Sequence, residues 1–348
     1  MSWKNIVGHE RERAAFERVW RRGRLAHAYL FAGPLGIGKR LFAMELAKAL
    51  LCERTTRDHE APLAACDQCP DCKQVVAGSH PDVHVACRPD ESMELPIEVM
   101  QEFCQNFRLK SARGRGKIAI LDDADDLNEE SANCFLKTLE EPPPRSMLIL
   151  VGTAPERQLS TITSRCQIVR FAPLHEEQVV AILAQHELHE QKQARRLARL
   201  SGGSPGLALQ LTDPALWEFR HKLLNGLASQ RVNSVALSNQ WIEFVEEAGK
   251  ESAPKRQRAA QVLRLLVLIV QDALAMALGA EPRETDPEEL NLLTKLAERA
   301  GPEQLLEIQE RCLEADVQID RRVQLSLVLE ALTDSLGKRI GGERIAVR

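Results

Sequence analysis

The chain has 348 residues, of which 44% are hydrophobic and 28% are charged, and its formal net charge is -4. This length predicts two or three domains with ordinary hydrophobic cores. The net charge excludes a polycation that binds nucleic acid by bulk charge, but it is compatible with a local basic face.

The sequence shows no pattern typical of a targeting signal or a membrane span. The first five residues do not resemble a signal peptide, and the most apolar stretch, residues 263–280, is interrupted by Arg264, Gln271 and Asp272. This pattern predicts a buried helix instead of a transmembrane one. We therefore expect a cytoplasmic protein without a membrane partner, whose nine cysteines are metal ligands or core thiols before disulfides.

The segment from 28 to 50 has the pattern of a nucleotide-binding P-loop. An apolar run at 28–32 predicts a strand, the sequence GPLGIGKR follows at 33–40, and apolar residues then recur at helical spacing. In such a loop the backbone N–H groups form a concave nest for phosphate, and the positive end of the helix dipole adds to it. The alternative interpretation is a plain Gly/Pro turn between a strand and a helix.

The side chains of this loop predict phosphate binding without the usual metal ligand. Gly33, Gly36 and Gly38 allow the backbone to bend, and Lys39 lies where the P-loop lysine reaches the terminal phosphates. Arg40 follows, at the position where Ser or Thr normally holds magnesium. A guanidinium has no acceptor with which to bind a metal, and the sequence leaves the binding of ATP or ADP open.

Four cysteines after the P-loop helix have the spacing of a zinc site. Cys52 is followed by Cys66, Cys69 and Cys72, and the last three are each separated by two residues. Thiolates at this spacing wrap one tetrahedral Zn²⁺, and Cys52 completes a four-sulfur site from the end of the helix. A zinc ion with four protein ligands has no open position and is therefore structural. Pro62, Pro70 and Gly78 predict a loop in this segment, which a metal could hold in place. The alternative is four free thiols in a mobile loop.

A basic run follows the next predicted strand and helix, at 83–86 and 96–110. It consists of Arg108, Lys110, Arg113, Arg115 and Lys117. The run is compatible with a surface for DNA phosphates or with a solvated loop before a strand, and the sequence favours neither.

Two further apolar strands, at 118–121 and 147–151, end in polar residues. The carboxyl ends of parallel strands are where open α/β sheets place their ligands. Asp122 fits the magnesium-side carboxylate of a Walker B element, and Asp123 is placed to orient an attacking water. In the alternative interpretation these acids only cap the helix that follows. Thr153 is placed to touch a phosphate or a water at the end of the second strand.

Four segments in about the first 210 residues resemble the bacterial clamp-loader ATPases of the AAA+ class. They are residues 27–40, residues 118–125, the sequence LKTLEEPP at 136–143, and Ser164-Arg165-Cys166. The cysteine insertion also matches the zinc module of that family, although its first spacing is longer here. The resemblance implies an α/β fold, an AAA+ P-loop module with a parallel sheet, followed by a small helical lid domain and an all-helical collar domain.

These segments divide the chain into three expected domains. We predict an AAA+ nucleotide-binding-like domain at 1–172 with the zinc insertion at 52–72, a helical lid at 173–212, and a helical collar that serves oligomerisation at 213–348. Alternating strands and helices support the parallel sheet of the first domain. From residue 213 onward the patterns are helical and no strand signal occurs. They include helices at 287–300 and 302–315, separated by a turn signal at Gly301-Pro302.

Three departures from the family pattern favour its non-hydrolysing type of subunit over its gamma/tau ATPases. Arg40 replaces the P-loop hydroxyl, Asp123 replaces the Walker B glutamate, and Gly206 stands where the sensor-two arginine is expected. Losing the metal hydroxyl and a transition-state arginine each slows hydrolysis by orders of magnitude. Arg165 is retained, and the resemblance implies that this residue acts as a trans arginine finger in the ATP site of a neighbouring subunit.

The resemblance implies a hetero-oligomeric ring with gamma/tau and delta subunits that loads the sliding clamp on primed DNA for DNA polymerase III. The chain is then a subunit that is not catalytic by itself. A gamma/tau-type ATPase remains an alternative because Lys39, Asp122 and Thr153 are present. A nucleotide-independent DNA-binding adaptor is the other alternative, and the basic run supports it. Subunit order, stoichiometry and direct contacts with DNA or the clamp are left open.

Overall fold

The computed structural model describes residues 3–55, 61–89, 92, 94–186, 188 and 190–340. It divides into two compact units. The first comprises Met1–His189 and Gly202–Leu207, and the second comprises Glu190–Ser201 and Ala208–Arg348. The unit boundary therefore passes through the predicted lid, and the division into three domains stays a prediction.

A five-stranded parallel sheet forms the centre of the first unit. Its strands are β1 (Ala28–Ala32), β2 (Val83–Ala86), β3 (Ile118–Leu121), β4 (Met147–Gly152) and β5 (Gln167–Arg170). They lie in the order β2-β3-β4-β1-β5, and each neighbouring pair is parallel. The three strands in the middle of this order are buried along their whole length, as expected where helices cover both faces of a sheet.

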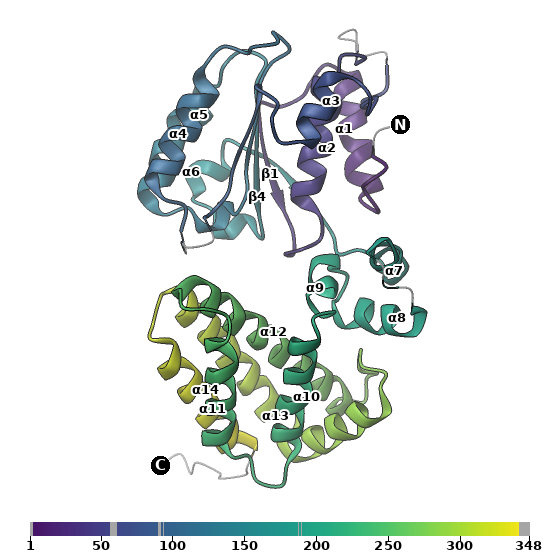
Figure 1. The fold of residues 1–348 in the computed structure, drawn as a ribbon, viewed down its shortest axis with the longest axis vertical. Coiled ribbons are helices and arrows are strands. Elements are labelled where there is room, and N and C mark those ends of the chain that lie inside the picture. Colours follow the sequence, from purple (N-terminus) through teal and green to yellow (C-terminus); the bar gives the residue numbers. More distant parts are fainter. Residues whose placement is uncertain are drawn as a thin grey trace. The chain divides into compact units, whose positions relative to one another are not determined.

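Helices cover both faces of this sheet, as Figure 1 shows. One layer contains α1 (Glu10–Arg21), α2 (Lys39–Leu51) and α3 (Pro70–Val76). The other contains α4 (Ile97–Arg108), α5 (Glu129–Glu140) and α6 (Ser160–Thr163). Short 3-10 turns, η1 (Ala124–Asp126) and η2 (Pro155–Arg157), follow β3 and β4, and α7 (Glu176–Gln185) follows β5.

Each helical layer has its own hydrophobic core against the sheet. In the α1–α2 layer, Phe42 packs at the centre of an aromatic group, with its ring centroid 5.9 Å from that of Phe31 and 5.1 Å from that of Phe171. In the α4–α5 layer, Phe107 and Phe135 are fully buried. Burial of side chains of this size contributes about 1.5–3 kcal/mol each, so the two layers hold the strand ends in fixed positions.

The described residues of the second unit form helices and the turns that connect them, with no strand among them. It contains α8 (Gln191–Leu200), α10 (Pro214–Ala228), α11 (Ser234–Glu246), α12 (Ser252–Ala277), α13 (Pro287–Asp320) and α14 (Leu325–Ile340), while α9 (Pro205–Gln210) spans the last unit boundary. The backbone of α13 is not helical at Gly301, which precedes Pro302, and the helix is kinked there. Leu329, Leu332 and Leu336 of α14 are buried, so the apolar stripe of this helix belongs to the core.

An ion-pair network is buried among the helices of the second unit. Arg220 of α10 is fully buried, and its Nη2 lies 3.1 Å from Oε2 of Glu284 in the segment between α12 and α13. Its Nη1 also contacts Oε2 of Glu289. Arg196 of α8 also pairs with Glu284, and its Nε lies 2.7 Å from Oε1 of that carboxylate. The network therefore joins α8, α10 and the start of α13.

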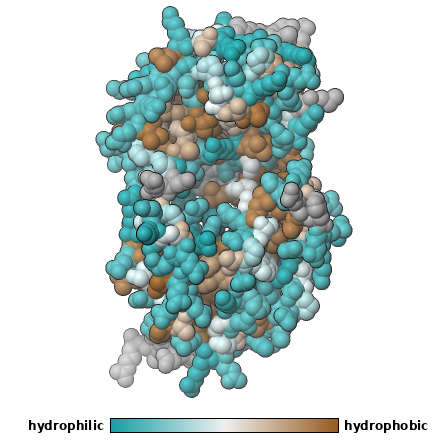
Figure 2. Space-filling view, in the orientation of Figure 1, coloured by the Kyte–Doolittle hydropathy of each residue, from teal (hydrophilic) through white to brown (hydrophobic). Residues whose placement is uncertain are grey.

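Helix α12 is long and apolar enough to cross a membrane by length and composition alone. However, 56% of its most apolar window is buried inside the structure, and Arg256 and Asp272 are buried along it. It packs as a core helix of the second unit, as predicted for residues 263–280. The face of the molecule in Figure 2 is mostly hydrophilic, with hydrophobic residues in small separate groups.

The predicted fold class, a parallel α/β P-loop module followed by helices, is confirmed. The strands at 83–86 and 118–121 have the predicted bounds. One local prediction is wrong. Part of the cysteine segment is not a loop but α3, because Pro70 at its first position is favourable for a helix start. The predicted break between helices at 287–300 and 302–315 is confirmed, because the backbone within α13 is not helical at Gly301.

Candidate functional site

The glycine loop between β1 and α2 has the backbone geometry of a P-loop. Gly36 and Gly38 have φ values of 73° and 97°, in the left-handed region that favours glycine. Helix α2 begins directly after Gly38, so its unpaired N–H groups lie at the loop. A Cβ built on Gly38 would meet nothing within 4 Å. At Gly33 the loop passes close to Phe171, whose carbonyl oxygen would lie 2.4 Å from a Cβ. The loop is therefore confined by Phe171 at Gly33 and open at Gly38.

Lys39 is folded into its own loop. Its ammonium donates to the carbonyl oxygens of Gly33 and Pro34, at 2.6 and 2.7 Å, and the residue is only 5% exposed. Burial lowers the pKa of Lys39, and the charges of Asp125 and Asp122 oppose that effect. The charge of Lys39 thus lies inside the loop, and its contact with terminal phosphates stays a prediction.

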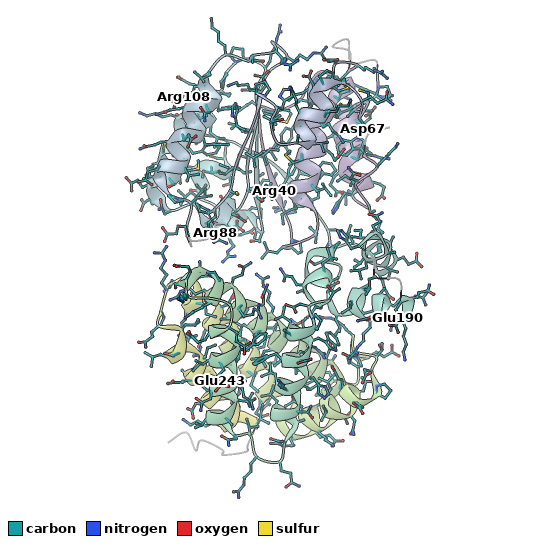
Figure 3. The ribbon with its side chains drawn as sticks, in the orientation of Figure 1. Arg40, Asp67, Arg88, Arg108, Glu190 and Glu243 are labelled. Carbon is teal, nitrogen blue, oxygen red and sulfur yellow. The ribbon has the colours of Figure 1, made fainter. Side chains whose placement is uncertain are left out.

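Arg40 forms an ion pair with Asp122. Its Nη1 lies 3.2 Å from Oδ2 of Asp122, which follows β3 directly. The Arg40 side chain is 54% exposed, whereas that of Asp122 is 15% exposed. The pair joins the start of α2 to the end of β3, at the position where the family resemblance places magnesium. In Figure 3, Arg40 and Arg88 lie at the same end of the sheet.

Asp125 organises the polar groups at the neighbouring strand ends. Its Oδ2 accepts hydrogen bonds from the backbone N–H and the hydroxyl of Thr153, at 2.7 and 2.5 Å. Its Oδ1 accepts one from Nε2 of Gln158 at 2.7 Å. Thr153 is therefore at the strand end, as predicted, but its hydroxyl is used to hold this carboxylate. Asp123 has a left-handed φ of 51°, and burial together with the charge of Asp122 raises the pKa of its carboxyl group.

Gly206, which stands where the sensor-two arginine is expected, packs directly on the P-loop. Its N–H donates to the carbonyl oxygen of Gly36 at 2.9 Å. A Cβ built on Gly206 would lie 2.7 Å from Cα of Gly36, too close for any side chain without a backbone shift. The hydroxyl of Ser204 donates to the carbonyl oxygen of Leu35 at 2.8 Å. An arginine at position 206 is thus incompatible with this packing.

Arg165 lies at the surface just after α6, and α5 holds its guanidinium. Nη2 of Arg165 is 2.6 Å from Oε1 of Glu140, at the end of α5. Nη1 donates to the carbonyl oxygen of Thr161 at 2.9 Å and to the hydroxyl of Ser164 at 3.3 Å. The two side chains of the ion pair are 37% and 49% exposed. The guanidinium is therefore oriented by its own chain and also accessible to another molecule.

The four predicted zinc ligands lie together. The Sγ atoms of Cys52, Cys66, Cys69 and Cys72 are all within 4.8 Å of one another. The Cys66–Cys72 and Cys52–Cys69 sulfur pairs are both 4.0 Å apart. Tetrahedral zinc with bonds of about 2.3 Å separates its sulfur ligands by about 3.8 Å. The donor set and its spacing therefore fit one Zn²⁺.

Backbone N–H groups point at three of these sulfurs. The N–H of Cys66 donates to Sγ of Cys52, that of Cys69 to Sγ of Cys66, and that of Cys72 to Sγ of Cys69, at 3.3 to 3.4 Å. The N–H of Gln68 contributes most among the groups that lower the pKa of the Cys66 thiol to about 6. Burial raises the pKa of Cys69 and Cys72. A bound cation favours all four thiolates and opposes that effect.

Cationic side chains attach the cysteine segment to the rest of the first unit. Arg115 donates from Nη1 to the carbonyl oxygen of Cys52 at 2.7 Å and from Nη2 to that of Glu53 at 3.0 Å. Lys48 of α2 lies 2.8 Å from Oδ1 of Asp67, between the second and third cysteines. Groups outside the segment thus hold it at its first residues and at Asp67, between Cys66 and Cys69.

The basic run at 108–117 is engaged mainly by the protein itself. Lys117 is buried and donates to the carbonyl oxygen of Asn106 at 2.6 Å. Arg113 lies 3.3 Å from the buried Asp71, and Arg115 binds the cysteine segment. The structure does not present these three cations as a free surface for DNA phosphates, so the adaptor alternative loses most of its support.

Arg108 and Lys110, the other two cations of the run, line a pocket of about 1000 Å³ together with Lys137 and Arg145. Glu140 and Glu141 line it too, so its charge is mixed. In Figure 3, Arg108 lies at the opposite end of the first unit from Arg40, away from the glycine loop.

The structure brings Lys39, Arg40 and Asp122 to one end of the sheet, as the sequence predicts, and gathers the four cysteines elsewhere. Sequence reasoning missed Glu140, the partner of Arg165, although the residue stands in the LKTLEEPP segment that carries the family resemblance. It also missed Asp125 as an acceptor for Thr153. Neither pairing has a signal in sequence spacing, because each joins different elements.

The comparisons with known proteins agree on one group. A family model described as DNA polymerase III, delta subunit, matches residues 8–175. The chain is 30% identical to the DNA polymerase III subunit delta' of Escherichia coli over 84% of each chain. It is 36% identical to subunit delta' of Pseudomonas aeruginosa, over 66% of this chain and 70% of that one. Subunit tau of Escherichia coli is 34% identical over 62% of this chain, but over 33% of its own length.

The chain was also compared with solved structures. A DNA polymerase III gamma subunit-related protein of Thermotoga maritima has a TM-score of 0.47 at 16% identity, covering 94% of this chain and 99% of that one. The DNA clamp loader delta protein of Bacillus subtilis has a TM-score of 0.33 at 13% identity, and the match covers 94% of this chain and 100% of that one.

Proposed function

The chain belongs to the delta-prime subunits of the DNA polymerase III clamp loader, and we propose that it assists ATP hydrolysis by a neighbouring subunit while hydrolysing little ATP itself. The observation that carries this proposal is the ion pair between Arg40 and Asp122. In this pair the guanidinium of Arg40 occupies the position at which a P-loop ATPase holds its metal ion. Arg165, in contrast, remains accessible at the surface.

The chain's own site does not fit magnesium. Mg²⁺ requires a nearly octahedral set of oxygen ligands at about 2.0–2.1 Å. Arg40 offers no oxygen, Asp122 is bound to the guanidinium, and the Thr153 hydroxyl and Asp125 are bound to each other. Because metal ions neutralise the charge that develops on transferred phosphate, a site without them is a poor catalyst.

Arg165 has the properties required of a residue that acts in trans. Glu140 and the carbonyl oxygen of Thr161 hold the guanidinium in one orientation, and more than a third of the side chain is exposed. An exposed ion pair contributes only about 0–1 kcal/mol, so the pair yields to a stronger anion such as a nucleotide phosphate. An arginine finger of this kind accelerates hydrolysis by about 10³ to 10⁵.

Partners and cofactor follow from the same proposal. The chain joins gamma/tau and delta subunits in a cytoplasmic ring that loads the sliding clamp on primed DNA, and its second, helical unit supplies oligomerisation contacts. One Zn²⁺ bound by Cys52, Cys66, Cys69 and Cys72 would hold the cysteine segment in its observed form. Such an ion acts by fixing the fold and takes no part in the chemistry.

The test is ATP turnover by a reconstituted complex with gamma/tau and delta subunits on primed DNA. We expect Arg165→Ala to leave assembly intact and to reduce DNA-stimulated turnover, because the neighbouring site loses its transition-state cation. Arg165→Lys keeps the positive charge but loses the planar guanidinium, and it is expected to restore little of the turnover that Arg165→Ala loses.

Two matched variants separate this role from a general loss of charge. Arg18→Ala removes an exposed cation from α1 of the same unit and is expected to leave turnover unchanged. Glu140→Gln keeps a hydrogen-bond acceptor for Arg165 and is expected to have a smaller effect than Arg165→Ala. Turnover that does not respond to Arg165→Ala in an assembled complex would refute the trans role.

A further inference from the structure

The P-loop of this chain contains two positively charged side chains, where an ordinary P-loop has one lysine and a divalent metal ion. Lys39 is buried in the loop, and Arg40 lies beside it with its guanidinium on Asp122. In an ordinary P-loop, the lysine and the divalent ion together balance the charge of the phosphates. Here the second positive charge is covalently part of the chain.

The guanidinium can serve a phosphate and Asp122 at the same time. Arginine has five N–H donors in a planar fork, and the ion pair with Asp122 uses Nη1. The side chain is 54% exposed, although its partner carboxylate is nearly buried. Charge-assisted hydrogen bonds from arginine to phosphate are among the strongest in proteins, and the fork matches phosphate geometry.

The loop next to this guanidinium is shaped for phosphate independently of any metal. Gly36 and Gly38 hold the backbone in left-handed conformations, and a side chain at Gly38 would meet open space. Lys39 is held at the loop by the carbonyl oxygens of Gly33 and Pro34, so its charge is already placed there. The missing component is an oxygen ligand for a metal, which Arg40 cannot supply.

We infer that Arg40 takes the place of the divalent cation, so that this P-loop binds a nucleoside polyphosphate without magnesium. The inference deepens the proposed function, because it rests on the same metal-free site that makes the chain a poor ATPase. It assigns the site a ligand class, nucleoside di- and triphosphates. It also predicts that binding does not require Mg²⁺, unlike binding in an ordinary P-loop ATPase.

The test is equilibrium binding of a fluorescent ADP and a fluorescent ATP analogue to the full-length chain, in EDTA and in excess Mg²⁺. We expect binding of at least one analogue with a Kd that differs by less than about twofold between the two conditions. Arg40→Ala is expected to weaken binding in EDTA by about 10- to 100-fold, the range for one hydrogen bond to a charged group. Arg40→Thr restores the metal-binding hydroxyl, and its binding is expected to require Mg²⁺.

The Arg18→Ala variant serves as a control, because it removes an exposed arginine of α1 that is not part of the glycine loop. Circular dichroism of each variant verifies that it is folded. Binding by the wild-type chain that disappears in EDTA overturns the inference, and so does the failure of both analogues to bind under either condition. Neither result affects the Arg165 experiment, which measures hydrolysis at a neighbouring subunit.

Discussion

The contact between Gly206 and the P-loop makes a quantitative prediction for the variant Gly206→Ala. The new Cβ would lie 2.7 Å from Cα of Gly36 and 3.1 Å from its carbonyl oxygen. Both are backbone atoms, so no side-chain rotation relieves the overlap. Overpacking of this kind costs about 1–3 kcal/mol, and losing the hydrogen bond from Gly206 to Gly36 adds about 0.5–1.5 kcal/mol.

Alanine in place of a helical glycine returns up to about 1 kcal/mol through its higher helix propensity. We therefore expect Gly206→Ala to weaken the local structure by about 1–3 kcal/mol. Hydrogen exchange of peptides covering 33–40 and 202–207 measures this opening directly, and exchange is expected to accelerate by about 5- to 150-fold. Gly337→Ala is the matched control, because Gly337 is also helical and its Cβ would lie 3.3 Å from a side-chain atom, Cβ of Ser234.

Unchanged exchange in both peptides of Gly206→Ala would show that the glycine pair does not hold the turn on the P-loop. Faster exchange in the Gly337→Ala variant to the same degree would show that the added methyl group, and not this contact, causes the effect. In either case the steric explanation for the missing sensor-two arginine would be wrong.

Cys69→Ser is expected to remove the metal, so elemental analysis should show zinc falling from one ion per chain to near zero, and protease should cleave the 52–72 segment more readily. A variant that keeps its full zinc content would contradict the four-sulfur site. Arg220→Met leaves Glu284 and Glu289 buried with Arg196 as their remaining arginine partner, and it is expected to cost up to about 3–5 kcal/mol in urea unfolding of the helical unit. Wild-type stability would exclude a stabilising role for the network. Burial acts to raise the pKa of Glu284, but the Arg196 hydrogen bond and the Arg220 charge outweigh it and lower the pKa below 4.5. The contribution of this carboxylate is therefore complete above pH 4.5 and lost as pH falls through its lower native pKa, and a wild-type stability profile without an acid decline would contradict this.

The sequence predicted the elements of the fold well because periodicity is a local property. The strand at 118–121 and the P-loop helix have a continuous or repeated apolar pattern, and the structure places both as expected. Helix α3 was missed because Pro70 is a breaker inside helices but a favourable first residue. That distinction depends on the cysteine before it, whose side chain accepts a hydrogen bond from the Cys72 N–H.

The candidate sites were predicted by residue type but not by pairing. The spacing of the cysteines limits how they fold, so the four-sulfur cluster could be predicted. In contrast, Arg40 and Asp122 are 82 residues apart, and Gly36 and Gly206 meet only because the turn after α8 returns to the loop. The absence of a P-loop hydroxyl was visible in the sequence, whereas the ion pair that replaces its metal required the structure.

We propose that this chain contributes to hydrolysis through Arg165 and not through its own P-loop. The most direct measurement is steady-state ATP turnover by the reconstituted complex on primed DNA, with wild-type chain, Arg165→Ala or Lys39→Ala. We predict a marked loss with Arg165→Ala and turnover within about twofold of wild type with Lys39→Ala, because the Lys39 site has no metal-based chemistry. Loss with Lys39→Ala and normal turnover with Arg165→Ala would contradict the account.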